Sequence, residues 1–204
     1  MRGFRDLIAS ISIFLLFTAV GSASELDQAQ ADPVPCSSDR LVRYFPEGTF
    51  REKDRHWDSD AFLRGWYSRH LNAMNETSLS CGPRTSDESY RFLWLRSFHA
   101  PIAVRIERTG EKYTLIGKIL DGLGGYDPGR IERRIRKHLT AEQWRRAIIA
   151  LDQLDFWKMP TTQHDIVGTD GAEWIIEGRK DAYHVVDRGA VTTECGKWGW
   201  CFWI

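Results

Sequence analysis

The stretch IAVRIERTGEKYTLIGKI, residues 102–119, decides the fold of this chain. Apolar residues occupy alternate positions from Ile102 to Ile106 and again from Tyr113 to Ile119, which is the two-residue period of a strand. The segment Thr109–Lys112 between them supplies a turn. The stretch therefore predicts a β-hairpin with one buried face.

Further strands are indicated on both sides of this hairpin. The segment Tyr90–Phe98 is aromatic and aliphatic with little charge, and reads as a strand. The segments Ala172–Glu177 and Tyr183–Asp187 form a second alternating pair, joined by residues 178–181. They predict a second hairpin.

The segment Ile131–Leu139 fits either a helix or a strand, and the residues after it decide between them. Thr140 followed three positions later by Gln143 is a capping box. A helix should therefore begin at Ala141, which makes the preceding segment a strand. The stripe of that helix, over residues 141–154, is Trp144, Ala147, Ile148, Leu151 and Leu154.

An earlier amphipathic helix is predicted from Asp60, as N-cap, to about Asn75. Consecutive strands interrupted by helices, without strict alternation, favour an α+β domain over a doubly wound fold. We expect an antiparallel sheet built from two hairpins, with one or two amphipathic helices packed on it.

The first residues have the three parts of a secretory signal peptide. Arg2 and Arg5 are basic, the run from Leu7 to Val20 is apolar, and small residues lead to a cleavage point after Ala23. The apolar run is short for a bilayer span, so a permanent anchor is the weaker alternative. We expect export to the periplasm or medium, with no stable membrane insertion once the leader is removed.

We expect the chain to consist of a leader, a lead-in, one domain and a tail. Residues 1–23 are the signal peptide, and residues 24–35, with Pro33 and Pro35, are a flexible lead-in. Residues 36–188 form a single α+β domain, and residues 189–204 form an atypical tail.

Charge gives little indication of a partner. Lys and Arg number 28 and so do Asp and Glu, which gives no overall electrostatic case for nucleic acid, and we expect none as a partner. The basic run from Arg130 to His138 could meet a phosphate-rich or acidic partner. A solvated charged face is the simpler interpretation, because no aromatic residues interleave the cations.

The four cysteines are Cys36, Cys81, Cys195 and Cys201, and they allow three pairings. Cys36 with Cys81 is the disulfide to test first, and the other pairings stay open. No Cys-x-x-Cys motif is present and no His lies at zinc-finger spacing from a cysteine. We therefore predict neither a metal site nor a cofactor.

Two places could hold a site. The segment 121–129 is rich in glycine and would form a loop, whose candidate ligand-binding residues are Gly122, Gly124, Gly125 and Asp127. A purely structural turn is the main alternative, because neither a Walker nor a Rossmann motif is present. The second place is the second hairpin and the residues before it, with His164, Glu173, His184 and Asp187 as weak catalytic candidates. Solvated or structural roles are the simpler explanation for these residues as well.

Three short motifs carry a resemblance to a known group of proteins. They are FWKMP at 156–160, DGAEW at 170–174 and YHVVDR at 183–188. They resemble small exported bacterial proteins of unknown function, over about residues 90–188. The group has no assigned activity, so the resemblance implies bacterial origin and export, and no site residue carries over.

The tail departs from this group, whose members continue after Asp-Arg with Trp-Ser and end in an apolar stretch. Three of the nine Trp and two of the four Cys fall in the last 16 residues. One added base before the Gly189 codon allows a reading that begins Trp-Ser and ends in apolar residues. We therefore expect that residues 189–204 are translated out of frame. The alternative is a true disulfide between Cys195 and Cys201 in a Trp-rich lid.

Two functions are compatible with these patterns. The first is a non-catalytic binding or interaction protein of the cell envelope or periplasm, favoured because no catalytic motif is present. The alternative is a small hydrolase that uses His and acidic residues at the second hairpin.

Overall fold

The computed structural model describes residues 44–51, 59–81, 83–162 and 171–188, all of which belong to one unit of the chain, 33–204. Its helices are α1 (Ser59–Ala73) and α2 (Ala141–Gln153), followed by the short 3-10 helix η1 (Phe156–Lys158). Its strands are β1 (Glu88–Arg96), β2 (Ile102–Thr109), β3 (Lys112–Leu120), β4 (Ile131–Leu139), β5 (Ala172–Arg179) and β6 (Tyr183–Arg188).

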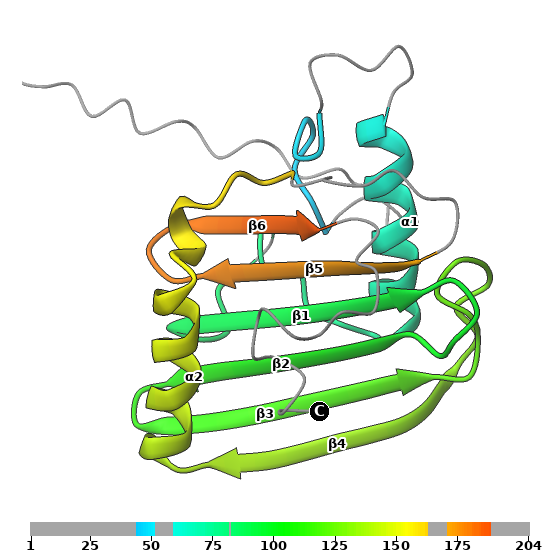
Figure 1. The fold of residues 1–204 in the computed structure, drawn as a ribbon. Coiled ribbons are helices and arrows are strands. Elements are labelled where there is room, and N and C mark those ends of the chain that lie inside the picture. The colour runs from blue at the N-terminus through cyan, green and yellow to red at the C-terminus, as the bar shows by residue number, and fades with distance from the viewer. Residues whose placement is uncertain (1–43, 52–58, 82, 163–170, 189–204) are drawn as a thin grey trace, which may run out of the picture. The chain divides into compact units, whose positions relative to one another are not determined.

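The strands form one six-stranded antiparallel sheet in the order β4-β3-β2-β1-β5-β6 (Figure 1). The two predicted hairpins are β2–β3 and β5–β6, and β1 lies between them. Both helices pack on this sheet, on opposite faces. The predicted α+β class is therefore confirmed, and so is the assignment of residues 131–139 to a strand.

The two strands of the first hairpin are joined by a short turn. β2 and β3 pair from Ile102 and Ile119 to Thr109 and Lys112, so only two residues lie between the strands. One of them, Gly110, has a φ of +57°, a left-handed conformation that glycine adopts without steric cost. The alternation in the sequence therefore located both strands and their turn.

The side of this hairpin that faces α1 is more deeply buried than the side that faces α2, although it carries charged residues. On the α1 side, Ala103 is 1% exposed and Arg105 is 7% exposed, whereas Ile102 and Val104 on the α2 side are only partly buried. The reason is coverage, because α2 packs on one end of its face, near Ile106. The alternation of apolar residues thus identified the strands, but it did not indicate which face of the sheet is more deeply buried.

The larger core lies between α1 and the sheet. It contains Tyr67 and Leu71 from α1 and Met74 directly after it, with Tyr44, Phe45, Phe50, Leu93, Leu95, Ala103, Leu120, Ile175 and Val185. Asp60 lies inside the first turn of α1 and is not its N-cap. Its carboxylate accepts hydrogen bonds from the amides of Gly48 (2.9 Å) and Phe50 (2.8 Å), which holds segment 44–51 against the helix.

The second core lies between α2 and the other face of the sheet. The predicted capping box is present, because Thr140 and Gln143 bond each other's backbone amides. Trp144 is 7% exposed and its ring stacks on Tyr113 of the first hairpin, with centroids 5.5 Å apart. Leu151 is also buried. This helix therefore shares a core with the first hairpin.

Candidate functional site

The catalytic candidates at the second hairpin do not converge. Glu173 and Asp187 lie on the α1 side of the sheet, as the register of β5 and β6 requires, whereas His184 lies on the α2 side. The sheet separates the imidazole from both carboxylates. His164 lies outside the described residues. Among the described candidates, the imidazole of His184 therefore does not share a surface with Glu173 or Asp187.

Each of these groups also has a structural environment of its own. Asp187 is fully buried, and it accepts a hydrogen bond from the Tyr67 hydroxyl at 3.0 Å. Burial and the nearby carboxylates of Asp187 and Glu173 raise the pKa of Tyr67 well above its ordinary value. The His184 ring packs edge-on against Phe156, with centroids 5.0 Å apart, and burial lowers its pKa. His184 is therefore a neutral packing residue at physiological pH.

The most concentrated charge in the described structure is a buried ion network on the α1 side of the sheet. Glu76, which follows α1, lies 2.6 Å from Lys118, 3.0 Å from Arg105 and 3.4 Å from Arg91. Arg91 in turn pairs with the fully buried Glu177. Burial by itself would raise the pKa of Glu76, but the three cations lower it below its ordinary value.

This network ties the segment after α1 to the central strands. Its charged side chains come from β1, β2, β3 and β5, and the backbone carbonyl of Thr77 accepts a further bond from Arg91 at 2.6 Å. Because each of the five groups has a charged partner at short range, the network is complete without a ligand. It is a structural centre rather than a candidate active site.

The glycine-rich loop between β3 and β4 packs closely against the protein backbone. A Cβ atom at Gly124 would lie 2.6 Å from the backbone of Arg96, and one at Gly125 would lie 3.1 Å from Ser97. The Gly124 amide donates to the His99 carbonyl (3.0 Å) and the Gly125 amide to the Ser97 carbonyl (3.2 Å). These amides are therefore engaged within the protein.

The remaining candidates in this loop are held in the same way. At Gly122 a Cβ would lie 2.2 Å from the backbone carbonyl of Asp127. The Asp127 carboxylate accepts a hydrogen bond from the Gly129 amide at 2.7 Å. Close packing accounts for the glycines, and the loop is fixed against the β1–β2 connection.

Large apolar side chains are exposed on this loop and on the β1–β2 connection beside it. Phe98 is 58% exposed, Leu123 39% and Tyr126 54%, and they are three of the five large apolar side chains that are exposed among the described residues. The rings of Phe98 and Tyr126 lie 5.9 Å apart. We call Phe98, Leu123 and Tyr126 the loop patch.

Helix α1 supports the loop patch from one side. The indole N–H of Trp66 donates to the Gly124 carbonyl (2.9 Å), and Arg69 donates to the Tyr126 carbonyl (3.1 Å). Figure 1 shows that the β1–β2 and β3–β4 connections lie at the same end of the sheet as α1. Apolar side chains that are held rigidly on the surface can bind a partner at low entropic cost.

The sequence indicated the loop but not the patch. Leu123 and Tyr126 stand between glycines in a segment that has no apolar periodicity, so they resembled ordinary loop residues. Phe98 comes from a different connection. The sequence predicted Phe98 as the end of a strand, 90–98, whereas β1 ends at Arg96 and leaves Phe98 in the β1–β2 connection.

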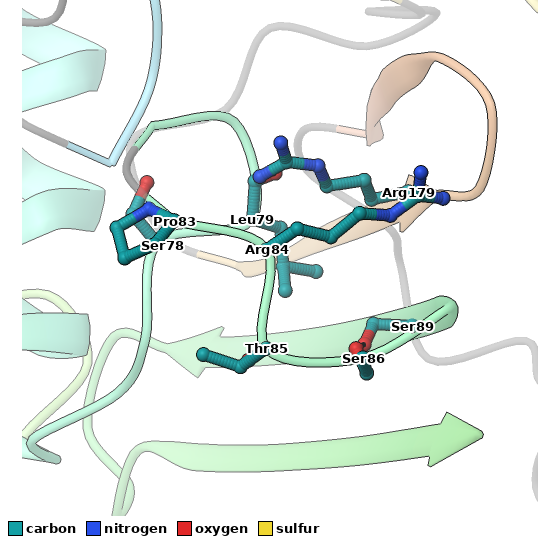
Figure 2. A pocket seen from close by; sticks show the side chains of 8 residues that line it. All are labelled: Ser78, Leu79, Pro83, Arg84, Thr85, Ser86, Ser89 and Arg179. Atoms are coloured by element: carbon teal, nitrogen blue, oxygen red, sulfur yellow. Dashed lines mark hydrogen bonds between the residues drawn. The ribbon is translucent and has the colours of Figure 1, made fainter. Parts of the chain in front are cut away.

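A small pocket lies beside the segment that leads into β1 (Figure 2). Arg84 and Arg179 line it, and Figure 2 shows their side chains running in opposite directions. Arg179 donates to the carbonyl of Leu79 (2.9 Å), and Arg84 donates to the carbonyls of Asp87 (2.7 Å) and Lys180. Their guanidinium groups therefore brace the backbone and do not converge on a ligand.

The described ranges contain neither a cluster of metal-binding side chains nor a membrane-spanning helix. No group of three or more His, Cys, Asp or Glu residues there could hold a metal ion. In the same part of the chain, no helix is both long and apolar enough to cross a membrane. Cys81 is disulfide-bonded, and its partner lies outside the described residues, so the pairing with Cys36 stays a prediction.

The leader, the lead-in and the tail beyond Arg188 also lie outside the described residues. Comparison of the chain with protein-family models, with curated proteins and with solved structures gave no match.

Proposed function

We propose that this chain is an exported, non-catalytic binding protein of the cell envelope or periplasm, and that it contacts a partner protein through the loop patch. The observation that carries the proposal is the patch itself, in which two aromatic rings and a leucine are exposed on two connections that pack against each other with close backbone contacts. Exposed aromatic side chains with rigid support are typical anchors of protein interfaces.

Two further observations support this assignment. His184 lies on the opposite face of the sheet from Glu173 and Asp187, which favours a non-catalytic role over the hydrolase alternative. The leader and the disulfide at Cys81 both favour an oxidising compartment outside the cytoplasm.

The test compares capture of envelope proteins by three forms of the full chain. The first is unchanged, the second carries Phe98→Ser with Tyr126→Ser, and the third carries Ile149→Ser. Ile149 is a matched control, because it is also a large apolar residue, 46% exposed, but lies on α2. All three should unfold at similar temperatures, since the changed side chains are exposed.

A partner of the loop patch should be captured by the unchanged chain and by Ile149→Ser, but not by the double variant. The captured protein should then be purified and its affinity measured, with an expected loss of about tenfold or more for the double variant. Equal affinity for all three forms would refute the proposal. Export is tested separately by amino-terminal sequencing of protein recovered from cells, and a mature chain that still begins at Met1 would overturn it.

A further inference from the structure

Among the described residues, the strand β4 forms an open edge of the sheet. The strand order places β3 on one side of β4 and no described strand on the other. The opposite edge, β6, is partly covered, because the Asp187 amide donates to the Thr161 carbonyl at 2.6 Å and Thr162 forms a bridge with Asp187. An open edge presents a row of backbone donors and acceptors to which an extended chain can pair.

Four of the nine residues of β4 are arginine or lysine. By its register with β3, the strand carries Arg134, Arg136 and His138 on the α1 side, and Arg133, Ile135 and Lys137 on the α2 side. All of these are exposed except Ile135, which is partly buried. The only acid in the strand is Glu132.

Most of the cations of β4 have no ion-pair partner among the described residues, unlike the cations of the buried network. Among the described residues, the only ion pair of β4 joins Arg136 to Glu107 at 3.8 Å, with the arginine 66% exposed. Like charges prevent the β4 edges of two copies from pairing. The same charges attract an extended chain of opposite sign.

We propose that β4 is a docking edge for an acidic, extended segment of a partner polypeptide, which adds to the sheet as another strand. The two sides of β4 define the pattern of that segment. One side should carry acidic residues at every alternate position, to meet Arg134 and Arg136. The other should carry an acid on each side of an apolar residue, to meet Arg133, Ile135 and Lys137. This surface is separate from the loop patch, and the proposal does not depend on it.

The probe is the blocked peptide Thr-Glu-Glu-Glu-Val-Glu-Glu-Glu-Thr, which has this pattern in either strand direction. Its binding to the purified full chain is measured by fluorescence anisotropy at low salt. A second peptide has the same side chains but is N-methylated at its central residues, which keeps the charge and removes the backbone donors. Vesicles of phosphatidylglycerol serve as an anionic surface without a peptide backbone.

The experiment also uses two double variants in which a pair of arginines is replaced by glutamates. Arg134→Glu with Arg136→Glu changes the edge, and Arg145→Glu with Arg146→Glu makes the same change on the exposed face of α2, where the arginines are 63% and 57% exposed. Both variants keep the core side chains, and thermal melting confirms that each is folded.

We expect the unmodified peptide to bind and to slow hydrogen exchange in residues 131–139. Binding should weaken about tenfold or more with the N-methylated peptide and with the β4 reversal, and much less with the α2 reversal. Three outcomes would overturn the proposal. They are no binding of the unmodified peptide, equal binding of the N-methylated peptide, and vesicle binding that depends on Arg134 and Arg136 in the absence of peptide binding.

Discussion

Replacing Glu76 by Gln tests the buried ion network directly. The substitution keeps the shape of the side chain and removes only its charge. Three cations, Arg91, Arg105 and Lys118, would then face a neutral amide in a region where the Glu76 side chain is 1% exposed. We expect a large loss of stability, because burying a charge costs desolvation free energy and the attraction to Glu76 would no longer offset it.

The size of this stability loss depends on which carboxylate partner each cation keeps after the substitution. Removing one partner of a buried pair costs about 3–5 kcal/mol. Arg91 keeps Glu177 and Arg105 keeps Glu107, so the value should lie near the lower limit, at about 3 kcal/mol. For a domain of this size that corresponds to a fall in melting temperature of about 6–12 °C.

The control is Glu142→Gln in α2. Glu142 is also paired with two arginines, Arg145 and Arg146, but its side chain is 59% exposed. Solvent screens these pairs, so the loss should stay below about 1 kcal/mol. Urea unfolding of the two variants and the unchanged chain measures both values. Equal losses at Glu76 and Glu142 would refute the reasoning.

The pH dependence gives a second check on Glu76. Its pKa in the folded chain is lowered, so its contribution to stability is present above the ordinary carboxylate pKa and is lost as the pH falls through the folded pKa. The difference in unfolding free energy between the unchanged chain and Glu76→Gln should therefore shrink in acid. A difference that stays constant to low pH would mean that charge is not its cause.

Three other perturbations have defined outcomes. Thr140→Ala removes one half of the capping box and should cost about 1 kcal/mol in urea unfolding, whereas retention of full stability would contradict the capping role. Gly124→Ala places a Cβ 2.6 Å from the Arg96 backbone and should destabilise by about 1–3 kcal/mol, while Gly65→Ala, with no atom within 4 Å, should stabilise by up to about 1 kcal/mol. Burial lowers the pKa of His70 and His184, so the unfolded chain binds more protons and stability should fall as the pH drops from about 7 to 5. Urea midpoints at the two pH values measure this fall, and no fall would show that neither histidine is held neutral.

Local patterns were sufficient for the elements of the fold. Alternation located both hairpins, and the Thr140 and Gln143 pair fixed the start of α2, which in turn identified residues 131–139 as a strand. These signals span a few residues each and depend on backbone preferences that do not need tertiary contacts.

Features made by distant residues could not be predicted in this way. Arg91 and Glu177 are 86 positions apart, and each looks like a surface residue until the sheet places them side by side. The loop patch likewise needs the β1–β2 and β3–β4 connections to meet, which follows from sheet order rather than from any motif. His184 and Asp187 are three positions apart along β6, and because this number is odd the strand places them on opposite faces of the sheet.

The central place of β1 has a consequence for how the chain acquires its structure. The strands β1 to β4 follow one another and each pairs with its predecessor, so they form from local contacts. The strand β5 arrives much later in the chain, yet it must pair with β1 and bring Glu177 to Arg91. Without β5, β1 would be an open edge and Arg91 would lack Glu177, one of its two carboxylate partners. A chain interrupted before β5 would therefore be both unstable and prone to pair with other copies, which makes it a ready target for chaperones and proteases.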